Sequence, residues 1–304
     1  MPVPWPAVTD TQDRGRLGTV LATLLAPILW GTTFITVTEF LPPGRPLLVA
    51  AARVVPAGIA LLALGALSPG WRPDSWRRTL VLSLCYYGLF FPFLIVAVYR
   101  LPGGVAAATS GVQPLMVALI ALIVSGARAT RIDIVVGIVA AIGVTMVVIQ
   151  PDAGFDVIGV SAGLAAQACF SAGVVLTKKY PTPPNRLADT GWQMVIAGVI
   201  LVPLVLIFEG LPESITATNL VAFAYLSLVV TGAAFLLWMN GVRKLPPTAP
   251  PLLNAAVPVT ATILGWVILD QTMSPIQLIG LIVAFGTISY GAVIGARSGR
   301  AAPS

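Results

Sequence analysis

The amino-acid sequence predicts an all-α integral membrane protein of ten transmembrane helices, arranged as two inverted five-helix repeats. The first observation is composition, because 57% of the 304 residues are hydrophobic and only 9% are charged, whereas an average soluble domain has about 25% charged residues. The second is that the apolar residues gather in blocks of about 20, the length of a helix that crosses roughly 30 Å of hydrocarbon. The third is a sequence repeat that relates the two halves of the chain.

Ten apolar blocks separated by short polar segments predict the membrane spans in chain order. The first half supplies 17–37 after TDTQDRGR, 47–67 after PPGRP, 79–98 after WRR, 104–124 after RLPG and 132–149 after ARATR. The second half supplies 157–177 after PDAGFD, 189–208 after PTPPNR, 219–240 after LPES, 248–269 after RKLPP and 275–295 after DQTMS.

The polar segments at the two ends predict short tails and no soluble domain. We expect a tail at 1–16, a first repeat at 17–149, a second repeat at 157–295 and a second tail at 296–304. The opening MPVPWPAVTDTQDRGR lacks the apolar segment of a signal peptide, so the first span is expected to stay in the protein.

The formal net charge of +6 has a topological pattern, which argues against nucleic acid as a partner. If the N-terminus is cytoplasmic, fourteen of the 17 basic residues fall in cytoplasmic segments, Arg45 and Arg100 lie outside, and Arg53 lies within a span. Such a bias sets the orientation of membrane helices. We therefore expect a multi-pass protein in the lipid bilayer of a bacterial-type plasma (inner) membrane, with both tails in the cytoplasm.

Two stretches of the chain carry the repeat. RLPGGVAAATSGVQPLM begins at Arg100 and KLPPTAPPLLNAAVPVT begins at Lys244, and their alignment without a gap sets Pro102 on Pro246 and Pro114 on Pro258. Each half contains five predicted spans, an odd number, so the halves must enter the membrane with opposite orientations. Inverted repeats of this kind are typical of secondary transporters.

The prolines Pro114 and Pro258 fall about ten residues inside their spans. Each removes one hydrogen bond of the helix, and interior prolines kink helices. The kinks could serve as hinges or could only shape helix packing, and the sequence leaves both interpretations open.

Four stretches carry a family resemblance: APILWGTTFITVTEFLPPGRPLL, VAVYRLPGGVAAATSGVQPLMVALIA, TGWQMVIAG and ATNLVAFAYLSLVVTGAAFLLWMNGVRKLP. Over 17–295 the chain resembles the EamA-type drug/metabolite transporters, ten-helix proteins built from two inverted five-helix repeats. Within them it is similar to the PecM-related blue-pigment (indigoidine) exporters. The resemblance implies an exporter of a small, flat, polar metabolite that is pigment-like or aromatic amino-acid-like.

The chain departs from the family at one feature. Members commonly carry a Gly-Glu pair after the fourth and ninth spans, whereas this chain has GARATR and LDQTMS there. Asp270 could replace one acid, but Ala127 leaves none at the other place, so any role of the first acid is in doubt.

Polar side chains within the spans are the candidates for substrate binding, because a polar group turned to lipid is costly. Arg53 could hold an anionic or carbonyl-bearing substrate with its planar donor fork, or it could snorkel and brace the helix through backbone carbonyls. Gln113 and Asn254 stand shortly before the repeated prolines. Their amides could bind a planar solute or join two helices.

Aromatic and further polar residues complete the candidate site. Trp30 could stack on a flat ligand or pack in the core, while Thr32, Thr33 and Gln167 could orient the ligand. The remaining candidates are Tyr86, Tyr87, Trp192, Gln193 and Trp238, of which Gln193 aligns with Arg53 across the repeat. For Tyr86, Tyr87 and Trp192, an interfacial belt or packing is the competing interpretation.

The spans lack the groups that most alternative functions need. The sequence has no histidine, and we expect no carboxylate deep in a span, so a proton-coupled carrier would depend on Glu39, Glu209 or Asp270 near span ends. We therefore hypothesise a weakly coupled or uncoupled exporter, with a membrane-embedded regulator or a channel-like facilitator as the alternative.

An intramembrane enzyme is not expected. The pattern from Gly159 to Gly163 spells G-x-S-x-G, but without histidine the usual triad cannot form, and small-residue packing explains the glycines. Cys85 and Cys169 are expected to pack within spans. No metal or cofactor is predicted, and the sequence leaves a monomer and a homodimer equally open.

Overall fold

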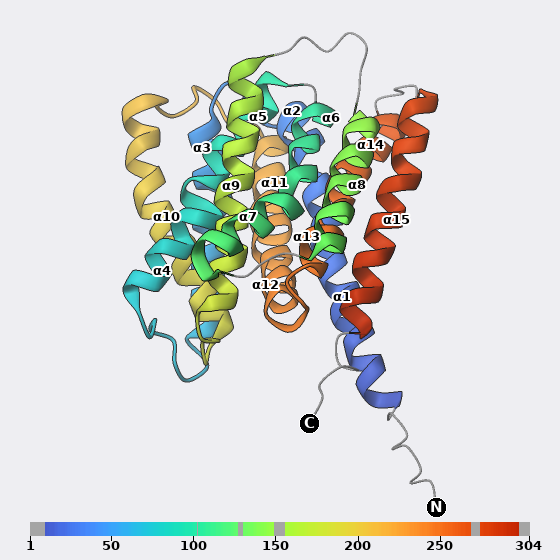
Figure 1. Cartoon of the computed structure of the whole chain (residues 1–304). Helices are drawn as coiled ribbons and strands as arrows, with labels where there is room; N and C mark the ends of the chain where they lie inside the picture. Colours follow the sequence, from blue (N-terminus) through green and yellow to red (C-terminus); the bar gives the residue numbers. More distant parts are fainter. Residues whose placement is uncertain (1–9, 102, 127–129, 149–155, 269–273, 298–304) are drawn as a thin grey trace, which may run out of the picture.

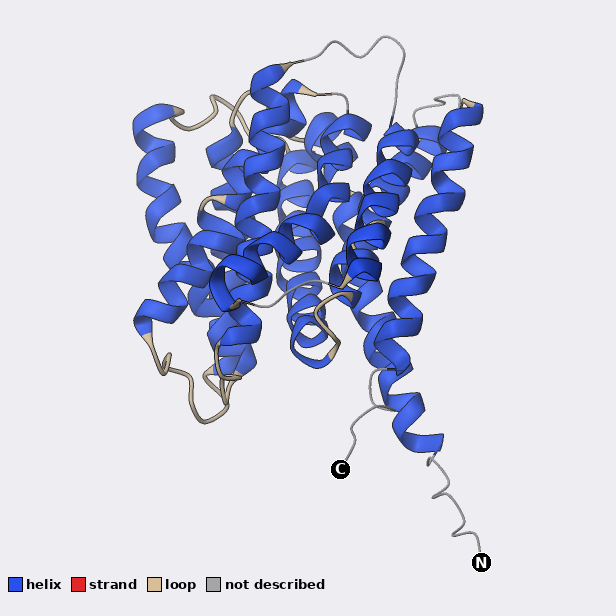
Figure 2. Ribbon diagram, in the orientation of Figure 1, coloured by secondary structure: helices blue, strands red, loops and turns tan. Residues whose placement is uncertain are grey.

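The computed structural model describes residues 10–101, 103–126, 130–148, 156–268 and 274–297, and these form helices joined by loops, with no β-strand among them (Figures 1 and 2). Within these ranges nine helical segments are long and apolar enough to cross a membrane. A further helix, α8, covers the predicted fifth span. The all-helical membrane fold is therefore confirmed, while Pro102, Ala127 and Asp270 lie outside the described residues.

Each predicted span corresponds to one helix or to a short series of segments. The first half contains α1 (Asp10–Gly31), α2 (Thr33–Phe40), α3 (Pro46–Gly65), α4 (Trp76–Ser83), the π-helical η1 (Leu84–Gly88), α5 (Phe90–Arg100), α6 (Gly103–Ala108), the 3₁₀-helical η2 (Thr109–Val112), α7 (Gln113–Ser125) and α8 (Arg131–Val148). The second half contains α9 (Val157–Lys179), α10 (Arg186–Phe208), α11 (Ala217–Ala224), the π-helical η3 (Tyr225–Ala233), α12 (Ala234–Lys244), α13 (Ala249–Leu253), α14 (Ala256–Ile268) and α15 (Pro275–Arg297).

Helix α1 begins earlier than the predicted span at residue 17. It starts at Asp10, within the segment expected to be an N-terminal tail. Hydropathy marks only the part of a helix that lies in hydrocarbon, whereas polar residues can continue the same helix in water. Helix α1 begins, and α15 ends, at the same end of the bundle (Figure 1); we refer to it as the terminal end.

Side-chain caps fix where several helices begin. The side chain of Asp156 accepts a hydrogen bond from the Gly159 N–H of α9 at 2.8 Å. Asn185 caps α10 in the same way, and Thr216 forms a capping box with Asn219 at the start of α11. Such caps satisfy backbone N–H groups that have no partner in the first turn. The Gly159 N–H, aided by Arg100, holds the pKa of Asp156 below its ordinary value.

The two spans that contain the repeated prolines change helical type or break shortly before the proline. Pro114 stands at the start of α7, after η2, and Pro258 stands near the start of α14, after the break that follows α13. In both, the residue before the proline donates its N–H to the carbonyl three positions back: Gln113 to Ser110, and Val257 to Asn254 at 3.0 Å. Proline cannot donate and clashes with the carbonyl four residues back, so the chain tightens there.

Two π-helical segments also recur at the repeat distance. Arg100 and Lys244 are 144 residues apart, and the same offset maps η1 into η3. A π-helix is rare and often lies at functional sites. The structural interruptions, like the sequence, thus repeat in both halves.

Helices from opposite halves pack in pairs. Helix α3 runs along α10, α5 along α9, α8 along α15 and α1 along α12. Glycines allow close approach in the first pair: a Cβ at Gly58 would lie 3.0 Å from Met194 Cβ, and one at Gly191 would lie 2.9 Å from Leu62 N. Small residues at such contacts are the usual means of packing helices in a membrane. The centre of the bundle is therefore built jointly by both halves.

Candidate functional site

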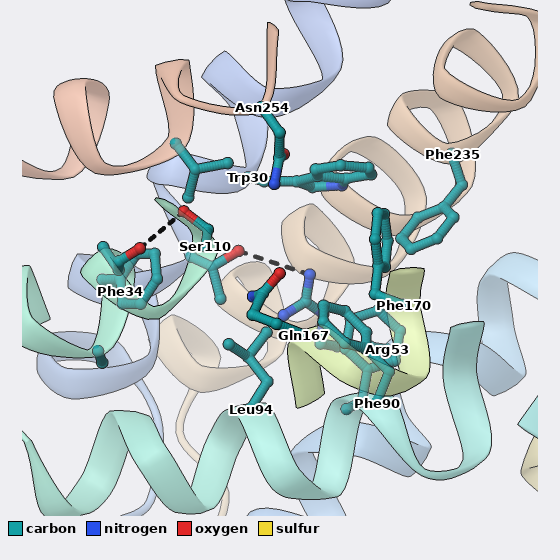
Figure 3. Close-up of a pocket in the computed structure, with 15 residues that line it drawn as sticks. Trp30, Phe34, Arg53, Phe90, Leu94, Ser110, Gln167, Phe170, Phe235 and Asn254 are labelled. Atoms are coloured by element: carbon teal, nitrogen blue, oxygen red, sulfur yellow. Dashed lines mark hydrogen bonds between the residues drawn. The ribbon is translucent and has the colours of Figure 1, made fainter. Parts of the chain in front are cut away.

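A cavity lies between the two halves of the bundle and is shown in Figure 3. Its walls come from α1, α2, α3, α5, α6 and η2 of the first half and from α9, α12 and α14 of the second half. The empty space measures about 470 Å³, part of it open to solvent. The enclosed cavity measures only about 40 Å³, well below the roughly 300–1,000 Å³ of small-molecule sites, so side chains must move before a metabolite can enter.

Arg53 of α3 places a positive charge in this cavity. Its side chain is 1% exposed. Nε donates to Thr231 Oγ1 at 3.1 Å and Nη2 donates to Thr33 Oγ1 at 3.5 Å. The guanidinium carbon lies 4.3 Å from the ring centre of Phe91, and Nη1 has no hydrogen-bond partner.

Two amide side chains face the same space with oxygen atoms that no described residue engages. Asn254 lies in the break between α13 and α14, and Gln167 projects from α9. The buried atoms Asn254 Oδ1 and Gln167 Oε1 have no hydrogen-bond partner among the described residues. An unpaired buried amide oxygen costs free energy, so both atoms suit a ligand that brings N–H or O–H donors.

Ser110 also lines the cavity and was missed from the sequence. It lies in η2, and the 144-residue offset sets it on Asn254. Its hydroxyl donates to Ala107 O at 2.7 Å. The gapless repeat alignment already contained this signal, because it pairs the two residues at the helix breaks.

Aromatic rings form much of the wall. The Trp30 ring lies 4.9 Å from Phe235 and 5.5 Å from Phe170, measured between ring centres. Trp30 Nε1 donates to Val230 O at 3.0 Å, so its ring rather than its N–H is available to a ligand. Phe90 and Phe91 line the cavity from α5. Rings around a few polar groups suit a flat ligand.

The structure therefore brings together five of the predicted site residues, namely Trp30, Thr33, Arg53, Gln167 and Asn254. Thr32 is used elsewhere: its hydroxyl donates to Leu29 O at 2.7 Å and contacts Tyr225 Oη at 2.9 Å. Gln113 is fully buried outside the cavity lining, and neither amide atom has a partner among the described residues. Pro258 is buried in α14, and Pro114 lines a second cavity.

The second cavity lies between α7, α8, α13 and α15 and is the larger, with about 840 Å³ of empty space that includes open solvent. Its acid, Asp133, is engaged by the N–H and hydroxyl of Thr130 at 3.0 and 2.7 Å. None of the unpartnered buried polar atoms of the described residues belongs to its lining. It therefore offers less polar recognition than the cavity around Arg53.

Trp192 belongs to an aromatic group at the terminal end, away from the cavity. Its ring lies 5.6 Å from Trp71 and 5.1 Å from Trp76, and its Nε1 donates to Trp71 O at 2.7 Å. Trp71 and Trp76 are exposed. Amphipathic rings in this position are typical of an interfacial belt.

A buried cluster of charged side chains lies nearer the terminal end than the cavity does. Asp189 Oδ1 accepts from Arg78 Nη2 at 2.6 Å, and Asp189 Oδ2 lies 3.4 Å from Arg243 Nη2. Gln193 Nε2 donates to Asp189 Oδ2 at 3.0 Å. We call Arg78, Asp189 and Arg243 the charge cluster.

The charge cluster contains a buried carboxylate in the first turn of α10, at the end of a span rather than deep within it. Asp189 is 3% exposed, although hydropathy placed it at the edge of the span 189–208. Its burial comes from α4 and α12, which supply Arg78 and Arg243 from distant parts of the chain. The candidate Gln193 therefore lies beside a carboxylate instead of the cavity.

Aromatic residues separate the charge cluster from the cavity. Tyr86, Tyr87 and Trp238 are fully buried, and Tyr86 Oη lies 3.1 Å from Thr177 Oγ1. Along the segment α4–η1–α5, Arg78 comes first and Phe90 lies about 18 Å further at 1.5 Å per residue. Trp238 lies 5.1 Å from Trp30 and Tyr87 lies 4.8 Å from Phe235 between ring centres, so an aromatic layer and then the ion pairs lie on this side of the cavity.

Two of the acids proposed for proton coupling, Glu209 and Glu39, do not line the cavity. Glu209 accepts hydrogen bonds from the backbone N–H groups of Leu47 and Leu48 at 2.7 and 2.8 Å, at the start of α3. Glu39 Oε1 accepts from Thr38 Oγ1 at 3.3 Å on the surface. Asp270 lies outside the described residues.

The glycines of the G-x-S-x-G pattern serve packing. A Cβ at Gly163 would lie 2.5 Å from Thr109 Cγ2, and one at Gly159 would lie 2.8 Å from Leu101 Cγ. These glycines allow α9 to approach the first half closely, which accounts for the pattern.

Comparison with known proteins shows matches along the whole bundle. The model of the EamA-like transporter family matches residues 17–149 and 157–290. Protein PecM of Dickeya dadantii (strain 3937) is 35% identical over 266 residues, covering 86% of this chain and 88% of PecM. The uncharacterized transporter YwfM of Bacillus subtilis (strain 168) is 28% identical over 86% of this chain and 89% of its own length.

A plant protein and a solved structure are also similar. The chloroplastic WAT1-related protein At3g02690 of Arabidopsis thaliana is 27% identical over 90% of this chain and 70% of its own length. A structure titled "Crystal structure of protein" superposes with a TM-score of 0.74 at 19% identity, covering 91% of this chain and 98% of the other. At that identity the superposition shows a shared fold.

Proposed function

Because the chain belongs to the EamA-like transporter family, we propose that it is a secondary transporter that exports a small, planar, polar metabolite across the bacterial plasma membrane. The substrate is pigment-like or aromatic amino-acid-like, and it crosses by alternating access. Similarity to transporters such as YwfM supports a membrane transporter. The substrate class rests on the chemistry of the cavity.

We further propose a ten-helix inverted repeat with both tails in the cytoplasm. The recurrence of helix breaks and π-helical segments at one offset supports two related halves. Helix α8 supplies the tenth span beside the nine that length and hydropathy identify in the described residues. The basic residues near the terminal end support its cytoplasmic orientation.

The observation that carries the proposal is the cavity between the halves, with unsatisfied polar atoms set among aromatic rings. Arg53 Nη1, Gln167 Oε1 and Asn254 Oδ1 are buried without partners in the described chain. The rings of Trp30, Phe170 and Phe235 stand beside them. A flat metabolite with a polar edge satisfies these atoms and buries its faces against the rings.

The layers between the cavity and the terminal end support alternating access. Interrupted helices beside a central site are a common construction in secondary transporters, and here the breaks at Ser110 and Asn254 both border the cavity. To release substrate on the cytoplasmic side, the protein must separate the aromatic layer and the charge cluster. The layers also argue against a channel-like facilitator, which would need a continuous open path.

Counterflow in proteoliposomes tests the proposal. Vesicles loaded with planar metabolites or aromatic amino acids are assayed with and without an imposed proton gradient, alongside Trp30→Leu and the lipid-facing control Trp266→Leu. We expect saturable exchange that the gradient leaves unchanged, weakened by Trp30→Leu alone. Non-saturable flux would support a channel, and no flux for any solute would support a regulator.

A further inference from the structure

Arg53 is a buried cation whose charge no group of the described residues neutralises. Its partners are the hydroxyls of Thr231 and Thr33 and the face of the Phe91 ring, all of which are neutral. No Asp or Glu lines the cavity among the described residues. Arginine stays protonated in proteins, and buried charges are normally paired.

The other buried arginines of the described chain provide an internal comparison. Arg78 and Arg243 have side-chain exposures of 6% and 8%, and both contact Asp189. The protein therefore pairs its buried guanidinium groups where they serve to hold helices together. Arg53 differs because its free Nη1 lies at a cavity, where a ligand can supply the missing anion.

The remaining cavity groups specify the rest of the ligand. Gln167 and Asn254 are neutral and present acceptor oxygens without partners, so they suit ring N–H groups. The first turn of the 13-residue helix α14 borders the cavity through Val257, and a helix N-terminus carries partial positive charge. No carboxylate is present in the lining to pair with a substrate ammonium.

We propose that the substrate is a planar aromatic or heteroaromatic monoanion whose carboxylate pairs with Arg53, an inference that rests on the proposed transport function. The pairing also determines the mode of transport. When the empty cavity closes, the charge of Arg53 stays uncompensated in a low-dielectric interior, whereas the loaded cavity closes with its charges paired. The carrier therefore exchanges substrate for substrate faster than it returns empty.

Three probes with one ring system separate the charge states. Indole-3-acetate is an anion, indole-3-acetamide is its neutral isostere, and tryptophan is a zwitterion. Each competes against a counterflow substrate in proteoliposomes and is also titrated onto purified protein by thermal shift. We expect the anion to compete at roughly tenfold lower concentration than the amide, which corresponds to about 1.4 kcal/mol.

Two substitutions assign the preference to Arg53. Arg53→Gln should remove the difference between acid and amide, and Arg53→Lys should keep part of it because the charge is retained. Arg131→Gln, a surface control on α8, should behave as the wild type. If Arg53→Gln fails to fold, the lysine variant and the wild-type probe series still decide the question.

Efflux measurements test the exchange mode. External substrate should accelerate efflux of internal substrate in the wild type, and Arg53→Gln should bring the ratio of the two efflux rates toward one. Equal competition by acid and amide, or competition by neither, would overturn the anion assignment. Counterflow of the other metabolites would still support the proposed transport function in that case. Absence of flux and binding for every probe and metabolite would instead overturn the proposed function and this inference together.

Discussion

Replacing Asp189 by asparagine should weaken the seal at the terminal end of the cavity. The substitution keeps the shape of the side chain but removes the negative charge that Arg78 contacts at 2.6 Å and Arg243 at 3.4 Å. Both arginines then remain buried and lose their counterion. Removing one partner from a buried ion pair costs about 3–5 kcal/mol, and the shorter Arg78 contact should supply most of it.

This cost falls on the sealed conformation, in which the cluster is assembled. If the cytoplasm-open conformation separates these groups, the variant should shift the population toward it, and about 3 kcal/mol corresponds to roughly 150-fold. The reporter is a cysteine at Thr177, next to Tyr86, in a background in which Cys85 and Cys169 are replaced by alanine. Its alkylation by a membrane-impermeant maleimide from the cytoplasmic side should accelerate strongly.

The exposed Asp74→Asn is the matched control, and it should change neither alkylation nor the melting temperature. Replacing Arg78, Asp189 and Arg243 together by Met, Leu and Met removes all three charges, and an apolar cluster of similar volume should seal about as well as the ion pairs. Equal alkylation rates in Asp189→Asn and Asp74→Asn would refute the reasoning, because the cluster would then contribute nothing to closure.

Three further predictions concern the cavity wall and two helix ends. Trp30→Leu should raise the substrate concentration for half-maximal counterflow about tenfold through lost ring contacts, while Trp266→Leu should leave it unchanged; equal effects would remove Trp30 from the site. Glu209→Ala should destabilise the protein by about 1–2 kcal/mol because α3 loses its cap, seen as a lower melting temperature in detergent, and an unchanged value would contradict this role. Asp156→Ala should lower the melting temperature at neutral pH. Because the Gly159 N–H holds the pKa of Asp156 below its ordinary value, the stabilisation is complete above the unfolded-state pKa and should fade as pH falls through the lowered one; a difference that grows in acid would contradict the assignment.

The sequence was informative wherever one residue type has a narrow range of roles. A charged side chain in an apolar span must find an interior, so Arg53 could be predicted to lie within the bundle. Prolines at equal places in two halves predicted a kink in each, although the sequence did not distinguish a hinge from a feature that only shapes packing. Whether the helix breaks depends on whether neighbouring helices stabilise the tightened turn. A hydropathy pattern carries no information on that packing.

The sequence was less informative where the direction of a side chain decides whether a residue lines the cavity. Gln113 was predicted to bind substrate, but Ser110, in the 3₁₀ turn before Pro114, lines the cavity and Gln113 does not. The sequence did not predict the buried position of Asp189, because its partners Arg78 and Arg243 lie far away in the chain. Both results depend on tertiary geometry that no local pattern encodes.

The pairing of helices across the two halves has a consequence for biosynthesis. Helix α3 enters the membrane long before α10 is translated. The surface around Gly58 therefore contacts lipid first and packs against α10 only later. The same delay separates α5 from α9 and α8 from α15. Neither half can complete its core during its own insertion. The interface between the halves forms only after the second half has entered the membrane, as the interface of a dimer forms only when both subunits are present.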